Sequence, residues 1–71
     1  MTIKIYTIYN GRYLIDDVGA LIYFDRSTGK FAYWKDEGRD GKVIVSGRCS
    51  NPSIGKVEID GEVVYERESK P

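Results

Sequence analysis

The sequence contains no histidine and only one cysteine, Cys49, among its 71 residues. Without histidine, the chain lacks the side chain that most often acts as a general acid or base near neutral pH and that commonly binds metals. A single cysteine cannot form a disulfide within the chain, and the lack of disulfides is typical of cytoplasmic proteins. We therefore expect a cytoplasmic protein with no metal, no cofactor and no catalytic residues.

Net charge and long apolar runs are also missing. Eleven basic residues balance eleven acidic residues, so a strongly basic nucleic-acid binder and a strongly acidic mimic of DNA are both disfavoured. No apolar run approaches the roughly 20 residues that a membrane-spanning helix needs. The first five residues, MTIKI, alternate polar and apolar side chains, a pattern that a signal peptide does not show. We expect no contact with a membrane.

Two acidic segments superficially suggest chemistry that the spacing does not support. Asp16 and Asp17 are adjacent, and consecutive residues of a strand point to opposite faces, so they cannot share a substrate. With the following Val18-Gly19 they are typical of a turn. Residues 36–47 match several positions of a calcium-binding loop, but Gly47 stands where that loop requires a glutamate.

The sequence does contain many aromatic residues and a regular series of turn signals. Aromatic residues make up 13% of the chain and include six tyrosines. The turn signals are Asn10-Gly11, Asp17-Val18-Gly19, Ser27-Thr28-Gly29, residues 38–41, Asn51-Pro52-Ser53 and Asp60-Gly61. The segments between them are rich in Ile, Val, Tyr and Phe, as β-strands are. We predict one all-β domain over residues 1–67, a meander of about six or seven short antiparallel strands forming a small barrel or sandwich, and a frayed tail over residues 68–71.

The first hairpin has a register that the sequence predicts directly. A two-residue turn at Asn10-Gly11 is a strong signal for a type I′ hairpin. It places Tyr6 opposite Ile15 and Ile8 opposite Tyr13, all on one face. Turn chemistry and apolar pattern therefore agree.

The second hairpin turns through Arg26–Gly29. This turn places Phe24 opposite Phe31 and Ile22 opposite Tyr33 on one face. On the other face the same register pairs Tyr23 with Ala32 and Leu21 with Trp34. In the simplest register of the next strand, Val45 lies beside Tyr33 and Ile44 lies beside Trp34.

The last hairpin admits two connections. A two-residue turn at Asp60-Gly61 would place Ile59 opposite a glutamate. A three-residue connection over 60–62 instead pairs Ile59 with Val63 and Val57 with Tyr65. We predict the three-residue connection because it gives one uniformly apolar face.

The middle strands have two apolar faces, although a domain of this size needs only one for its core. We assign the longer row to the core: Ile22, Phe24, Phe31, Tyr33, Val43 and Val45. The opposite face carries Leu21, Tyr23, Trp34 and Ile44. An exposed patch of this composition is typical of a binding surface, so we predict that these four residues bind a partner. The alternative is a small closed barrel in which Trp34 is half-buried at the rim.

These observations favour a small non-catalytic protein that binds a protein partner and could inhibit it, of the accessory or anti-defence kind that phage genomes encode. Two alternatives stay open: a weak nucleic-acid-binding barrel, and a structural subunit that self-assembles, for example as a homodimer, through the aromatic face. Residues 1–35 have an excess of basic side chains, interleaved with tyrosines. We take Tyr9, Arg12 and Tyr13, beside the first turn, as a secondary candidate site.

Overall fold

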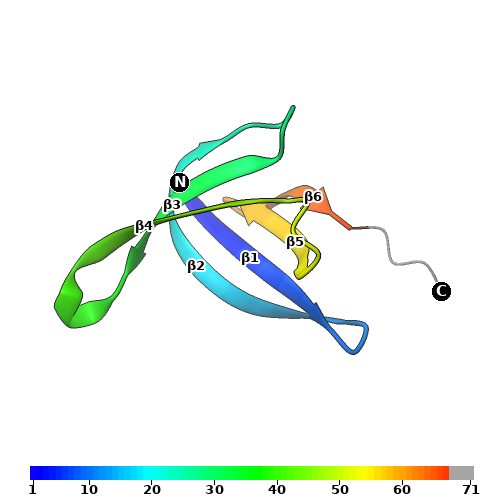
Figure 1. The fold of residues 1–71 in the computed structure, drawn as a ribbon, viewed down its shortest axis with the longest axis horizontal. Helices are drawn as coiled ribbons and strands as arrows, with labels where there is room; N and C mark the ends of the chain where they lie inside the picture. Colours follow the sequence, from blue (N-terminus) through cyan, green and yellow to red (C-terminus); the bar gives the residue numbers. More distant parts are fainter. Residues whose placement is uncertain (68–71) are drawn as a thin grey trace.

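The computed structural model describes residues 1–67 and shows one antiparallel sheet of six strands, which confirms the predicted all-β fold (Figure 1). The strands are β1 (Thr2–Tyr9), β2 (Arg12–Phe24), β3 (Lys30–Asp36), β4 (Lys42–Arg48), β5 (Ile54–Ile59) and β6 (Glu62–Glu66). A short 3₁₀ turn, η1 (Gly38–Asp40), connects β3 to β4. The predicted frayed tail, residues 68–71, lies outside the described residues.

The strands follow the order β4-β3-β2-β1-β5-β6 across the sheet. All neighbours in this order are also neighbours in sequence, except for the pair β1–β5. Strand β1 therefore joins an N-terminal meander, β1 to β4, to the C-terminal β5–β6 hairpin. The tips of the β1–β2 and β3–β4 hairpins protrude on different sides of the molecule (Figure 1).

One face of the sheet, here called the inner face, carries the core. Ile3 and Val57 are fully buried there, and Phe31 and Tyr33 are almost fully buried. These residues belong to one cluster, although β3 and β5 are separated by two strands in the sheet. The sheet must therefore curl around its inner face. Within the described residues β4 and β6 do not pair, so the architecture is an open curled sheet, neither a closed barrel nor a two-sheet sandwich.

The first hairpin has the predicted register. Asn10 and Gly11 adopt φ values of 52° and 75°, as a type I′ turn requires. Tyr6 then lies opposite Ile15, and Ile8 lies opposite Tyr13. All four side chains project from the outer face of the sheet, opposite the core.

The second hairpin departs from the prediction at Ile22. Phe24 pairs with Phe31 and Tyr23 with Ala32 as expected, but the register then shifts, so that Leu21 pairs with Tyr33. Ile22 is the extra residue of a β-bulge, a feature that changes which side chains reach each face. The assignment of Ile22 to the core is wrong, because the bulge leaves it exposed while Leu21 packs against the core.

The remaining core assignments divide between the buried inner face and the open edge of the sheet. Phe24 and Val45 pack against the core as expected. Val43 is 37% exposed, so its assignment to the core is wrong. It lies in β4, at the edge of the sheet, where no further strand covers it.

The expected turn at residues 16–19 is also wrong, since these residues lie within β2. A Cβ atom on Gly19 would lie within 2.5 Å of the Tyr33 ring and of the Trp34 carbonyl oxygen. The glycine therefore allows a close approach between β2 and β3 and does not reverse the chain. Asp17 points to the inner face and accepts a hydrogen bond from the Tyr33 hydroxyl.

The last hairpin has the two-residue turn, so the predicted three-residue connection is wrong. Asp60 and Gly61 have φ values of 51° and 83°, and Ile59 pairs with Glu62. The expected pairing of Val57 with Tyr65 is nevertheless present, because a register shift in β6 absorbs one residue. The expected pairing of Ile59 with Val63 is wrong, because Val63 lies opposite Glu58 and is exposed, while Val64 and Tyr65 pack against the core.

Candidate functional site

The outer face of β2, β3 and β4 carries a row of exposed large side chains. Trp34 lies in the centre of this row, opposite Ala20 on β2 and opposite Ile44 on β4. Tyr23 lies opposite Ala32, two residues along β3 from Trp34. Tyr23, Trp34 and Ile44 are 47%, 41% and 59% exposed. We call these three residues the outer aromatic patch.

The sequence predicted a fourth member, Leu21, and that placement is wrong. The bulge at Ile22 turns Leu21 to the inner face, where it pairs with Tyr33 and packs against the core. Ile22 is exposed beside Tyr23 in its place. Sequence reasoning missed Ile22 because a strict alternation of faces assigned it to the core.

Ala32 lies beneath the patch and is only 4% exposed, although it is on the outer face. A methyl side chain cannot bury itself, so larger neighbours must cover it, and Tyr23 lies directly opposite. If the Tyr23 ring covers Ala32, it has less conformational freedom to lose when a partner binds. Such pre-positioned aromatic side chains are typical of residues that dominate a binding interface.

The outer face over β1 and β5 has a different character. The Lys56 Nζ atom lies 4.5 Å from the centre of the Tyr6 ring and 5.3 Å from that of Tyr13. It also lies 3.4 Å from a Glu58 carboxylate oxygen, and the Tyr6 hydroxyl donates a 2.9 Å hydrogen bond to Glu58. These interactions satisfy one another, so this cluster stabilises the pairing of β1 with β5 and offers little to a ligand.

The same cluster perturbs two titratable groups. The hydrogen bond to Glu58 raises the pKa of the Tyr6 hydroxyl. The reciprocal hydrogen bond from Tyr6, together with Lys56, lowers the pKa of Glu58. Both shifts keep Tyr6 protonated and Glu58 ionised at neutral pH, the states that favour the cluster.

The secondary candidate residues do not form one site. Tyr9 lies opposite Arg12, so these two side chains share the inner side of the hairpin tip, where they line a shallow hollow with Leu14. Tyr13 points to the outer face, and its hydroxyl donates to the Arg67 carbonyl oxygen at 3.4 Å. Burial raises the pKa of Tyr13. It belongs to the β1–β5 side of the molecule and lies apart from Tyr9.

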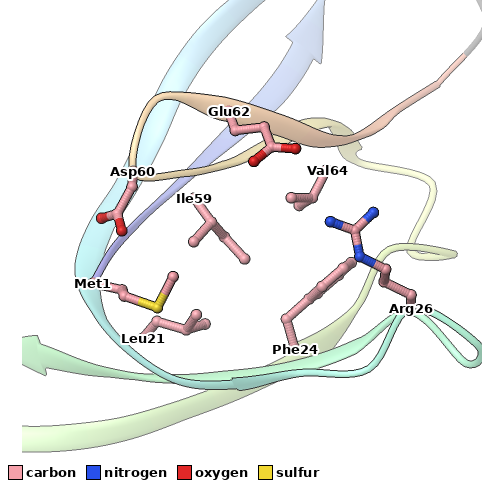
Figure 2. Close-up of a pocket in the computed structure, with 8 residues that line it drawn as sticks. All are labelled: Met1, Leu21, Phe24, Arg26, Ile59, Asp60, Glu62 and Val64. Carbon is pink, nitrogen blue, oxygen red and sulfur yellow. The ribbon is translucent and has the colours of Figure 1, made fainter.

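A hollow of about 310 Å³ opens on the inner face, between the C-terminal end of β2 and the β5–β6 hairpin. Figure 2 shows Leu21 and Phe24 on one side of it and Ile59 and Val64 on the other. Three charged side chains lie at its rim: Arg26, Asp60 and Glu62. The apolar walls are an extension of the core, and the rim mixes both signs of charge. The hollow is therefore less suited to a specific ligand than the exposed row on the outer face.

A smaller hollow lies where the outer aromatic patch meets the end of β4. Tyr23, Lys30, Ser46 and Arg48 line it. Lys30 and Arg48 are directly opposite each other on neighbouring strands, so two positive charges lie beside the Tyr23 ring. This is the part of the surface that best fits an anionic group.

Two buried groups that could react, the Tyr33 hydroxyl and the Cys49 thiol, both have raised pKa values. The Tyr33 hydroxyl donates to Asp17, and burial and this hydrogen bond raise the Tyr33 pKa. Lys35 lies 3.3 Å from the same carboxylate. Cys49 is buried, and its burial raises the pKa of the thiol, which disfavours the reactive thiolate. Across residues 1–67, no three His, Cys, Asp or Glu side chains come together as metal ligands would.

Comparisons with protein-family models, with curated protein sequences and with solved structures found no match to this chain. The part of the chain that the structure describes has no helix of the length and hydrophobicity needed to cross a membrane. The candidate site therefore depends on the geometry of the outer face alone.

Proposed function

We propose that the protein is a non-catalytic binding module that engages a protein partner through the outer aromatic patch. The observation that carries this proposal is the joint exposure of Tyr23, Trp34 and Ile44 on one face of three paired strands. Large apolar side chains gathered on one exposed face are typical of interaction surfaces. Tyrosine and tryptophan are enriched among the residues that dominate binding energy.

The partner that fits this patch is a folded protein with an apolar, weakly charged surface. The small side chains of Ala20 and Ala32 lie opposite Trp34 and Tyr23, and Ile44 lies directly opposite Trp34, so the neighbours of Trp34 across the sheet are apolar. Binding of this kind would block whatever surface of the partner it covers, which makes inhibition one outcome of the same chemistry. A cytoplasmic location fits the unpaired and buried Cys49.

The test measures affinity for a partner captured from cells of the source organism and then purified. Trp34→Ala should weaken binding about thirtyfold, which corresponds to the roughly 2 kcal/mol that defines a dominant interface residue. Tyr9→Ala is the matched control, because Tyr9 is also an exposed aromatic residue but lies at the hairpin tip. Unchanged affinity in both Trp34→Ala and Tyr23→Ala would contradict the proposal.

Trp34 is the one tryptophan of the chain, so the tryptophan fluorescence of the protein reports on this residue alone. At 41% exposure, its emission in the unbound protein should be red-shifted and readily quenched by acrylamide. Addition of the partner should shift the emission to the blue and protect it from quenching. A blue, quencher-resistant emission in the unbound monomer would show that the patch is covered.

Nucleic acid is the second candidate partner, supported by the two cations beside Tyr23. Lys30 and Arg48 could contact phosphates while a base stacks on the ring. Salt separates the two functions, because phosphate contacts weaken steeply with ionic strength and an apolar interface changes little. Titration of a fluorescent single-stranded oligonucleotide at two salt concentrations makes the comparison.

A further inference from the structure

The two edges of the sheet differ in a way that bears on self-association. An edge strand presents unpaired backbone groups that can accept another strand, and proteins usually protect such edges. Strand β6 has five residues, a glutamate at each end and a register shift within it. Strand β4 has seven residues, pairs with β3 without any shift, and contains three consecutive β-branched residues. Both edge strands have a charged residue at each end, Lys42 and Arg48 in the case of β4, but only β6 is also short and irregular.

The register of β3 with β4 identifies which backbone groups of β4 point outward. The Cys49 N–H donates to the Gly29 carbonyl oxygen at 2.9 Å, and the Glu37 N–H donates to the Gly41 carbonyl oxygen at 2.7 Å. Hydrogen-bonded and non-bonded pairs alternate in an antiparallel ladder. The pairs Gly29–Cys49 and Glu37–Gly41 are therefore hydrogen-bonded, and so is every second pair between them. The backbone N–H and C=O groups of Val45 consequently point toward β3, while those of Ile44 and Ser46 point away from the sheet.

Outward backbone and outer-face side chains coincide on the same residues, because both alternate with a period of two. A strand that pairs with β4 would therefore bond to Ile44 and Ser46 and place its own side chains beside theirs. The row of Ala20, Trp34 and Ile44 across the sheet would continue into the added strand.

Charge along β4 favours a particular occupant. One end of the edge is basic, with Lys30 and Arg48 opposite each other. The other end begins with Lys42 and adjoins the β3–β4 connection, residues 37–41, which has two acidic residues against one basic residue. An antiparallel copy of the same strand would place its basic end beside this acidic connection, and the reverse contact would form at the other end.

We infer that the protein forms a two-fold symmetric dimer by antiparallel pairing of β4 with β4 of a second copy, with Ile44 opposite Ile44 of the second copy. This register pairs Lys42 with Ser46 of the second copy and brings Arg48 toward the acidic connection. The symmetric register centred on Val45 would oppose Lys42 and Arg48, and like charges in opposition destabilise a strand pair. The register centred on Ser46 would oppose Ile44 and Arg48.

This inference goes beyond the proposed function and does not depend on it. Edge pairing leaves Trp34 and Tyr23 uncovered, so a dimer would present two outer aromatic patches on one continuous surface. Loss of dimerisation and loss of partner binding are separate measurements, and they use different variants.

The first test is sedimentation equilibrium of the full chain at increasing concentration. The expected result is reversible association from 8.1 kDa to twice that mass. Ile44→Lys and Ile44→Glu should each weaken association at least tenfold, because each places two like charges in opposition. An equimolar mixture of the two variants should restore the dimer as a mixed pair. Val63→Lys is the matched control, since Val63 is an exposed residue of the β6 edge strand, and it should dimerise as the wild type does.

The second test is amide hydrogen exchange of the wild type at low and high concentration. Exchange of the Ile44 and Ser46 amides should slow as the dimer forms, whereas that of Val45 should not change. A protein that stays monomeric at millimolar concentration would overturn the inference, as would dimers of Ile44→Lys as tight as the wild type. Failure of the mixed variants to associate would overturn the proposed register. If the chain stayed monomeric and β4 instead paired with a strand of another protein, the proposed dimer would likewise be overturned.

Discussion

Gly19 shows how one missing side chain shapes the core. Glycine in a strand weakens it, because the unfolded chain loses more conformational freedom there. Here the Tyr33 ring and the Trp34 carbonyl oxygen occupy the space that a Cβ atom would take. The close approach lets Tyr33 lie across β2 and reach Asp17.

Replacement of Gly19 by alanine should therefore destabilise the protein by about 2–3 kcal/mol, in the upper range for overpacking, since one of the obstructing atoms belongs to the backbone. Gly47→Ala is the matched comparison. Its Cβ atom would lie 3.0 Å from the end of the Phe31 ring, which can shift slightly. Urea denaturation should give a clearly smaller loss for Gly47→Ala, and equal losses would contradict the account.

Tyr33 carries its hydroxyl group into the core, where ionisation is disfavoured. Burial and the hydrogen bond to Asp17 raise its pKa above the ordinary value of 10.0. Below pH 10 the folded and unfolded states both hold the proton. Above pH 10 the unfolded state releases it while the folded state retains it, so the free energy of unfolding falls as pH rises.

We expect Tyr33→Phe to reduce this alkaline loss of stability, by at most about 1.4 kcal/mol per pH unit for one titrating group. At neutral pH the same variant should lose about 1–2 kcal/mol, because the hydrogen bond to a carboxylate is gone. Urea midpoints between pH 8 and pH 11 provide the measurement. The pKa values of Tyr6 and Tyr13 are also raised, so the free energy of unfolding of Tyr33→Phe should still fall as pH rises, but less steeply than that of the wild type. If the free energy of unfolding fell with pH as steeply in Tyr33→Phe as in the wild type, Tyr33 would not be the source of the alkaline loss of stability.

The hairpins show what local sequence determines and what it does not. The turns at Asn10-Gly11 and Arg26–Gly29 follow from local chemistry: positive φ at glycine, and an Asp25 carboxylate that accepts hydrogen bonds from both Ser27 N–H and Ser27 Oγ. Their registers were predictable near the turn. The bulges at Ile22 and in β6 were not, because a bulge is stabilised by packing across the whole sheet. Those bulges decide that Leu21 belongs to the core and Ile22 to the surface.

The bulge makes a prediction that reverses the sequence pattern. Leu21→Ala should destabilise the protein by about 2–3 kcal/mol, because it removes packing against the core. Ile22→Ala should change stability by less than about 1 kcal/mol, because Ile22 is exposed. Thermal or urea denaturation of the two variants compares adjacent residues of similar size. A larger loss for Ile22→Ala would place the bulge elsewhere.

The pairing of β1 with β5 holds the whole molecule together. Among the described strands, it is the one hydrogen-bonded pairing between strands that are not consecutive in the chain. Ile3 and Val57, on these two strands, are the two large side chains that are fully buried. Sequence periodicity could identify both strands, but it could not show that they pair, because no turn connects them. The exposure of Trp34 could not be predicted for the same reason, because it depends on which face of the sheet the last hairpin covers.

The β1–β4 meander and the β5–β6 hairpin share one core. We therefore expect Val57→Ala to destabilise the whole molecule and not only the last hairpin. The expected loss is about 2 kcal/mol, as for other buried aliphatic truncations. Trp34 fluorescence reports on β3, and far-UV circular dichroism reports on all strands. Both probes should give the same lowered urea midpoint. If Trp34 fluorescence kept its wild-type midpoint, the two parts would unfold independently.

Cys49 follows the end of β4, with its N–H bonded to the Gly29 carbonyl oxygen and its thiol buried. A thiol reagent can reach this sulfur only when the β3–β4 hairpin separates from the core. The rate of its modification therefore measures how often that hairpin opens under native conditions. Since the chain has no other cysteine, the unmodified protein already contains a single-site probe of the kinetics of its own edge strand.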